Sequence, residues 1–223
     1  MAVIHRTTLT PTKLELLTSW LPTRPWYEGE GRPELLRGGG FRLDDPQGEV
    51  GIDFMVVTDV SGDRPVSYHV PLTYRGAPLE DAGQALIGTA EHGVLGSRWV
   101  YDGAHDPVLV AQLHALLHGD AEPQHQSVSD TPDPSVVASL TGAPVPGPVR
   151  LTAVADGPHA TDVVVDGDGD GDEGGRLTLR FTRVMRPGET DAEGTRGHVM
   201  AGWRLPDETE VRGVYVVVAD APR

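Results

Sequence analysis

Residues 66–74 read VSYHVPLTY and contain the clearest strand pattern of the chain. The apolar set alternates with polar residues and Pro71, and it consists of Val66, Tyr68, Val70, Leu72 and Tyr74. Residues 50–56 alternate in the same way, and Ser61-Gly62-Asp63 supplies turn residues between the two stretches. The pattern predicts an antiparallel hairpin with one buried face. Because proline has no N–H to donate, Pro71 is expected at a sheet edge, a strand end or a bulge.

Two helices are expected on either side of this hairpin. Thr10 is a candidate N-cap and Pro11 a first helical residue for a helix with Leu14, Leu17 and Leu21 at helical spacing. A stronger helix pattern follows Asp106 and Pro107, with an apolar stripe and a closing Gly119. The stripe consists of Leu109, Leu113, Leu116 and Leu117.

The second half of the chain reads as almost entirely β-structure. Residues 121–148 are rich in Pro, Ser and Asp without an apolar period, which predicts a linker or a long loop. After it come strand candidates at 149–154, 161–165, 177–184 and 211–218. These patterns predict an α+β protein with a domain at 1–120, a linker or loop at 121–148 and a β domain at 149–223.

Composition disfavours two classes of partner and limits the location and the chemistry that we expect. The 18 Lys and Arg residues stand against 33 Asp and Glu, a formal net charge of −15, which disfavours nucleic acid and anionic membranes as partners. The chain has no cysteine and no apolar run long enough for a signal peptide or a membrane span, so a cytoplasmic location is expected. Its only lysine is Lys13, which excludes any mechanism that needs a lysine elsewhere.

Motifs for catalysis or metal binding are incomplete. The Asp/Gly run at 166–175 matches part of a calcium loop, but Leu177 stands where a bidentate Glu is needed, so a solvated hairpin loop is the better interpretation. His114 and His118 have a spacing that can bind metal, yet no HExxH motif is present and exposed polar-face histidines are the simpler interpretation. No GxSxG motif occurs. We therefore expect no catalytic residue, no metal site and no cofactor.

Four segments of the first half resemble a known domain. They are WLPTRPWY at 20–27, SYHVPLTYR at 67–75, LIGT at 86–89 and WVYDGAHDP at 99–107. In order and spacing they resemble the N-terminal cap domain of actinobacterial maltokinases over roughly residues 10–120. The resemblance implies a curved antiparallel sheet with helices.

The resemblance continues into the second half. Residues 149–220 resemble the first strands of the small lobe of aminoglycoside-phosphotransferase-type kinases, which implies a small antiparallel sheet. On that pattern the nucleotide-holding lysine falls at Arg180, and residues 156–160 form the phosphate loop. An arginine is not a geometric substitute for lysine. Asp156 repels phosphate and Pro158 lacks an N–H, so usual nucleotide binding is doubtful.

The expected function follows from this resemblance. The sequence stops where the catalytic large lobe of such a kinase begins, which predicts a non-catalytic accessory or regulatory protein tied to glycogen, maltose or trehalose metabolism. The alternative is a sugar- or nucleotide-binding module that uses the cleft between the halves, and a stand-alone enzyme ranks third.

The expected partner is another protein or a second copy of the chain. Because strand 211–218 lacks charged gatekeepers, it should be buried or lie beside an interface. The residues expected to serve packing or an interface are Trp26, Tyr27, Trp99, Tyr101 and Val216.

Overall fold

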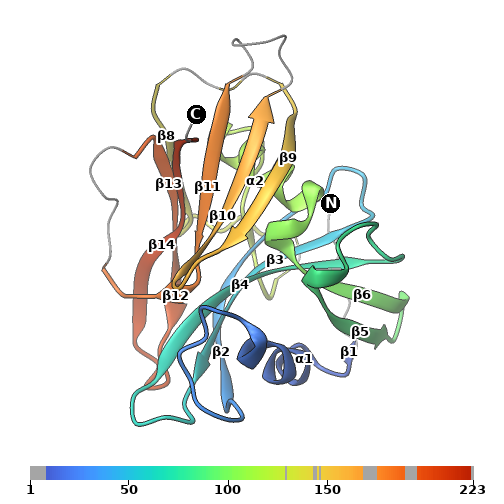
Figure 1. Cartoon of the computed structure of the whole chain (residues 1–223), viewed down its shortest axis with the longest axis vertical. Coiled ribbons are helices and arrows are strands. Elements are labelled where there is room, and N and C mark those ends of the chain that lie inside the picture. Colours follow the sequence, from blue (N-terminus) through green and yellow to red (C-terminus); the bar gives the residue numbers. More distant parts are fainter. Residues whose placement is uncertain are drawn as a thin grey trace.

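The computed structural model describes residues 9–128, 130–142, 145, 147–167, 175–188 and 195–221. Within them the chain forms two antiparallel sheets and few helices (Figure 1). The first sheet is strongly curled into a half-barrel and the second is smaller, which confirms the predicted fold class. None of the described helices is long and apolar enough to cross a membrane.

The first sheet has eight strands in the order β1-β5-β6-β4-β3-β2-β7, with β12 paired to β4 off this path. Its strands are β1 (Leu9–Thr10), β2 (Leu35–Leu43), β3 (Gly51–Asp59), β4 (Val66–Arg75), β5 (Leu86–His92), β6 (Gly96–Asp102), β7 (Gln124–His125) and β12 (Val184–Met185).

The second sheet has six strands in the order β8-β13-β14-β11-β10-β9. They are β8 (Val137–Leu140), β9 (Val149–Asp156), β10 (Ala160–Gly167), β11 (Arg176–Thr182), β13 (Gly197–Arg204) and β14 (Glu210–Asp220). The helices are α1 (Lys13–Trp20) and α2 (Pro107–His118), with short 3-10 helices η1 (Leu21–Thr23), η2 (Gly83–Ala85) and η3 (Gly103–His105).

The predicted hairpin is confirmed as β3 and β4, which pair from Gly51↔Tyr74 to Asp59↔Val66. The expected single buried face is wrong, because both faces of the hairpin are covered. Met55, Val57 and Tyr68 pack under α1, whereas Phe54 on the opposite face joins a core shared with the second sheet.

Pro71 lies where β4 changes its neighbour on one side. Val184 of β12 pairs with Tyr68, and pairing with β6 begins at Leu72. Between them the His69 N–H donates to the Arg183 carbonyl at 2.9 Å. Pro71 therefore lies at a break in the pairing, and no hydrogen bond between strands is lost because proline has no N–H.

The first helix begins two residues later than predicted. Thr12, not Thr10, is the N-cap, and it forms a reciprocal capping box with Glu15. Thr10 instead pairs with Glu91 in the first sheet. Glu15 at the third helical position is the signal that favours Thr12 over Thr10.

The second helix forms as predicted. Asp106 caps it by accepting from the Val108 N–H at 2.9 Å, and Pro107 is its first residue. Gly119 ends it with a φ of 79°, a conformation that glycine adopts without strain. Arg75 of β4 donates two hydrogen bonds to the same Asp106 carboxylate, at 2.7 and 2.6 Å, and so joins the helix to the first sheet.

The segment 121–148 supplies a short strand to each sheet. β7 pairs with β2, and β8 pairs with β13. One hydrophobic core then spans both sheets and α2, with Phe41 and Phe54 from the first sheet, Phe181 and Val216 from the second, and Leu113 from the helix. The predicted domain boundaries stay a prediction. Residues 168–174, which form most of the Asp/Gly run, lie outside the described residues.

Strand 211–218 has a buried position, which is the first of the two expected outcomes. It forms most of β14, and β13 and β11 flank β14 on its two sides. Val216 pairs with Phe181 and is fully buried. The absence of charged gatekeepers is therefore consistent with an internal strand rather than an exposed edge.

A buried ion pair joins the two sheets. Arg183, between β11 and β12, is 0% exposed, and its Nη2 donates to Asp102 Oδ2 at the end of β6 at 2.5 Å. Its Nε donates to the Thr161 hydroxyl at 2.7 Å, and its guanidinium lies 4.9 Å from the ring centroid of Trp26. An arginine buried this completely depends on such partners, since an unpaired buried charge is strongly destabilising.

His69 lies in the same interface. Its Nδ1 is 3.1 Å from the Thr182 carbonyl, and its ring packs among Phe54, Phe181 and Tyr215. Burial, together with the charge of Arg183, lowers the pKa of His69 to about 3. The imidazole is therefore neutral in the folded protein at neutral pH.

Removing Arg183 should destabilise the fold strongly. We expect Arg183→Ala to lower the free energy of unfolding by about 3–5 kcal/mol, because Asp102 is left buried and unpaired. Arg204→Ala is the control, since the Arg204–Glu210 pair is exposed and its loss should cost no more than about 1 kcal/mol. Urea denaturation measures both. Equal effects of the two substitutions would contradict this role of the buried pair.

Acid should destabilise the protein through His69. The folded-state pKa lies below the ordinary 6.5, so the unfolded state binds the proton first, and stability present at neutral pH is lost as the pH falls from about 6.5 to about 3. At pH 4 this loss amounts to about 3 kcal/mol relative to pH 7. We expect His69→Asn to remove that part of the pH dependence in urea denaturation, and His125→Asn, at an exposed histidine, to leave it unchanged. An unaltered pH dependence in His69→Asn would refute the assignment.

Candidate functional site

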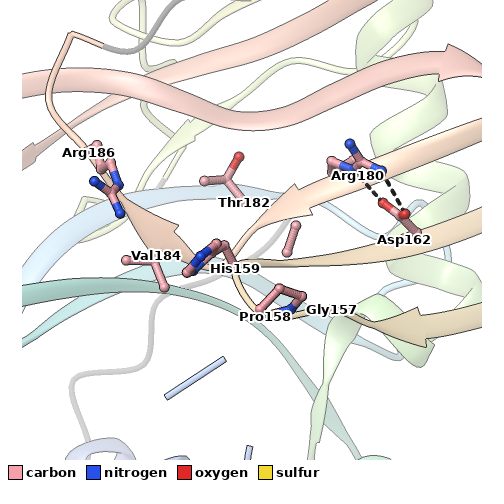
Figure 2. Close-up of a pocket in the computed structure, with 9 residues that line it drawn as sticks. Gly157, Pro158, His159, Asp162, Arg180, Thr182, Val184 and Arg186 are labelled. Carbon is pink, nitrogen blue, oxygen red and sulfur yellow. Dashed lines mark hydrogen bonds and ion pairs between the residues drawn. The ribbon is translucent and has the colours of Figure 1, made fainter. Parts of the chain in front are cut away.

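An open hollow of about 640 Å³ lies beside the turn between β9 and β10 (Figure 2). It is lined by Gly157, Pro158, His159, Ala160, Asp162, Arg180, Thr182, Val184 and Arg186. These residues come from the β9–β10 turn, from β10 and β11, and from β12 and the residue after it. The hollow therefore unites Arg180 with the turn that the kinase resemblance assigns to phosphate.

Arg180 projects from the outer face of the second sheet. On the opposite face of β11, Leu177, Leu179 and Phe181 are fully buried, as the strand alternation predicts. Asp162 on β10 pairs directly with Arg180 in the strand register. Its two carboxylate oxygens accept from Arg180 Nε at 2.7 Å and Nη2 at 2.9 Å, as Figure 2 shows.

This pair changes what Arg180 can do. The hydrogen bonds to Asp162 raise the pKa of Arg180 above its ordinary value, so the guanidinium stays charged. However, two of its donors and its net charge are already matched by a carboxylate. A phosphate approaching Arg180 would have to compete with Asp162.

The β9–β10 turn offers few donors to an anion. The Gly157 N–H donates to the Ala160 carbonyl at 2.7 Å, which closes the turn. Pro158 has no N–H. The Asp156 carboxylate accepts from the Thr161 hydroxyl at 2.5 Å and stays beside the turn as a negative charge. A phosphate cradle needs backbone N–H groups that point at the anion, whereas Pro158 has none and Gly157 uses its own within the turn.

Arg186 lies at the end of the hollow away from Arg180, with Thr182 between them, and His159 of the β9–β10 turn also lines the hollow (Figure 2). Glu28 of the first half approaches His159, with its Oε1 3.4 Å from the imidazole Nδ1. The lining residues themselves all belong to 157–186, and Val184 gives part of the hollow an apolar wall. The hollow thus combines charged pairs with a small apolar surface at the junction of the two sheets.

The aromatic residues predicted for packing or an interface lie away from the hollow's lining. Trp26 is fully buried, and its ring meets that of Trp20 edge to face at 5.7 Å. Tyr27 donates its hydroxyl to Asp59 Oδ2 at 2.7 Å. Burial, followed by the bond to Asp59, raises the pKa of Tyr27.

Trp99 and Tyr101 lie together in a small cluster at β6. Tyr101 is 2% exposed, and its hydroxyl accepts from the Leu79 N–H at 2.9 Å. Trp99 is half-buried and packs against the cluster that Tyr101 forms with Ala82 and Ala85. Their contacts are those of core and half-buried side chains.

Sequence reasoning missed both Asp162 and Arg183. Asp162 is opposite Arg180 once β10 and β11 are paired as a hairpin, so the strand register could have revealed the pair. Arg183 follows Phe181 by two residues and so shares its inward direction under strand alternation. An arginine at an inward position is a sign of a buried ion pair.

Comparison with known families concerns the first half of the chain. Residues 20–106 match the maltokinase N-terminal cap domain. This confirms the suspected family for that segment, which begins in the WLPTRPWY corner and ends at the cap of α2. The lining of the hollow, at 157–186, lies outside the matched range. No curated protein matches the chain.

Releasing Arg180 from Asp162 should improve anion binding at the hollow. We expect Asp162→Asn to tighten pyrophosphate binding about fivefold at low ionic strength, the equivalent of about 1 kcal/mol for an exposed ion pair. Isothermal titration calorimetry measures the effect. Adding Arg180→Ala should remove the gain.

The matched control is Asp166→Asn. Asp166 forms the same two-bond pair with Arg176 on the same two strands, outside the lining of the hollow. An equal gain in Asp166→Asn would show that the net charge, rather than Arg180, governs anion binding.

Proposed function

We propose that this chain is a non-catalytic accessory or regulatory protein that binds another protein, or a second copy of itself, in the cytoplasm. Its family link makes glycogen, maltose or trehalose metabolism the process in which it acts. The observation that carries the proposal is the Arg180–Asp162 pair at the position that the resemblance assigns to the nucleotide-holding lysine. A side chain that binds nucleotide phosphates needs its charge and donors available to them.

An exposed apolar turn in the cap-like half supports a role in protein contact. Val94 and Leu95, between β5 and β6, are 61% and 47% exposed. The His92 Nδ1 accepts hydrogen bonds from both of their N–H groups, at 3.3 and 3.1 Å, which holds the turn in shape. Two adjacent exposed apolar side chains on an ordered turn can fill a pocket of a partner without a large ordering cost.

The alternative function is binding of a sugar or nucleotide. The sequence-based expectation places it in a cleft between the two halves, whereas the hollow that favours it is lined by residues of the second half alone. Its volume of about 640 Å³ lies in the range of small-molecule sites, and this is the observation in its favour. A ligand there would meet Arg186, Thr182 and the apolar side chain of Val184.

Light scattering coupled to size-exclusion chromatography tests the protein-binding role. We expect a mass above that of the monomer when the purified chain is concentrated or mixed with a purified maltokinase or trehalose-converting enzyme. Val94→Glu combined with Leu95→Glu should weaken the complex at least tenfold, since charges would replace the apolar contact. Val128→Glu is the control, because Val128 is 48% exposed at a different site.

Three outcomes would count against the proposal. A monomeric mass at every concentration and in every mixture would contradict binding to a protein partner or to a second copy of the chain. Thermal stabilisation by one sugar or nucleotide, lost in Arg186→Ala, would favour the alternative. Formation of ADP from ATP in the presence of Mg²⁺ and maltose or glucosamine, abolished by Arg180→Ala, would show that the chain is an enzyme.

A further inference from the structure

The outer face of the second sheet takes no part in the hydrophobic cores. The strands β14, β11, β10 and β9 lie side by side in this order (Figure 1). On their inner face, side chains such as Leu179 and Val163 belong to the main core. Among the described residues, the apolar side chains on the outer face of these four strands belong to none of the hydrophobic clusters. This outer face is therefore a candidate surface for contact with a partner.

One row of side chains across the outer face has a symmetrical order. The strand registers place Val217, Arg180, Asp162 and Ala155 beside one another on β14, β11, β10 and β9. Residues paired across strands share a face of the sheet. The row therefore reads apolar, basic, acidic, apolar. Such a row is complementary to a second copy of itself that is turned over, because each base then meets an acid.

The next row along the strands keeps apolar residues at its two ends. It consists of Ala219, Thr178, Val164 and Ala153, in the same strand order. When this row is turned over, the alanines of β14 and β9 meet each other, and the threonine meets the valine. This row therefore places no charge opposite an apolar group in a self-complementary contact.

The charged residues of the outer face are exposed and balance one another. A second ion pair joins Arg176 of β11 to Asp166 of β10, so both arginines are on one strand and both aspartates on the next. The Arg180 and Asp162 side chains are 57% and 36% exposed. Although the whole chain has a net charge of −15, these two arginines and two aspartates sum to zero.

A second copy can cover this face around a two-fold axis that runs along the strands between β11 and β10. The rotation places β10 of the partner opposite β11, and β9 of the partner opposite β14, as in face-to-face sheet packing. Arg180 then faces the partner's Asp162, and Val217 faces the partner's Ala155. The bonds to Asp162 within one chain engage Nε and Nη2 of Arg180, so its Nη1 group can donate to the partner's carboxylate.

We propose that two copies of the chain associate through this outer face, with the Arg180–Asp162 pairs of both copies at the centre of the contact. The inference rests on the proposed function, because it assigns the self-association named there to one surface. A partner copy brings an arginine together with each aspartate, so it neutralises Asp162 as well as Arg180, which a phosphate does not. The net charge of each copy opposes approach, but physiological salt screens that repulsion beyond about 8 Å.

Sedimentation velocity at about 0.15 M salt, over a range of protein concentrations, tests the contact. We expect a dimer whose dissociation constant rises at least tenfold in Asp162→Arg, because an arginine then faces the partner's Arg180. The matched control is Glu210→Arg, which changes the net charge equally at an exposed ion pair near the start of β14. The dissociation constant of this control should stay within about twofold of that of the unaltered chain.

Mixing two variants makes the test specific to this pairing. Asp162→Arg and Arg180→Asp should each be monomeric alone, and their mixture should form a one-to-one complex, because every arginine then meets an aspartate of the other chain. A monomeric unaltered chain, an equal effect of Glu210→Arg, or a mixture without a complex overturns the proposal.

A measurement on the unaltered chain keeps the test decisive if the variants fold poorly. Within one chain Val217 and Ala155 are three strand spacings apart, about 14 Å, which is too far for a nuclear Overhauser effect between their methyl groups. We expect this effect between labelled and unlabelled chains in a mixed sample. A dimer without it uses another surface and refutes the inference. A monomer that still binds a maltokinase overturns the inference and leaves the proposed function standing.

Discussion

The Arg183–Asp102 ion pair is the contact on which the arrangement of the two sheets depends. Asp102 is at the end of β6 in the first sheet, and Arg183 directly follows β11 of the second. Arg183 is 0% exposed. Leaving its buried charge without a partner would cost a large part of the free energy of unfolding, which is small in any native protein. The pair therefore fixes where β11 ends and where β12 begins to pair with β4.

Local patterns predicted the elements that depend on neighbouring residues. The hairpin of β3 and β4, the helix capped by Asp106 and the alternation around Arg180 follow from side-chain period and capping chemistry, which are encoded within a few residues. The second buried face of β3 could not be predicted, because the core that covers it includes residues of α2 and of the second sheet, which lie far away in the sequence. Burial by residues distant in the sequence cannot be recognised from the local alternation of apolar and polar residues.

The candidate site was likewise predictable in part from local sequence and in part not. The resemblance located Arg180 and the 156–160 turn, and strand alternation gave the direction of Arg180. Its pairing with Asp162 depends on the register between β10 and β11, which is set by the turn geometry and by packing across the sheet. Likewise, the spacing of His114 and His118 is visible in the sequence, whereas the burial of His114 is visible only in the folded chain, where the backbone of Val145 contacts its imidazole.

The position of β12 has a consequence for the order of folding. The ribosome completes the segment that matches the cap domain long before residues 181–185 exist, yet the His69 ring of that segment stacks near Phe181 and the His69 N–H donates to the Arg183 carbonyl. Until those later residues emerge, the part of the inner face of the first sheet that the second sheet covers has no partner, and the final contacts have a large sequence separation. Such long-range closure slows folding and leaves apolar strands exposed during synthesis. The protein thus depends most on protection from aggregation during the period of synthesis in which only its cap-like half has emerged.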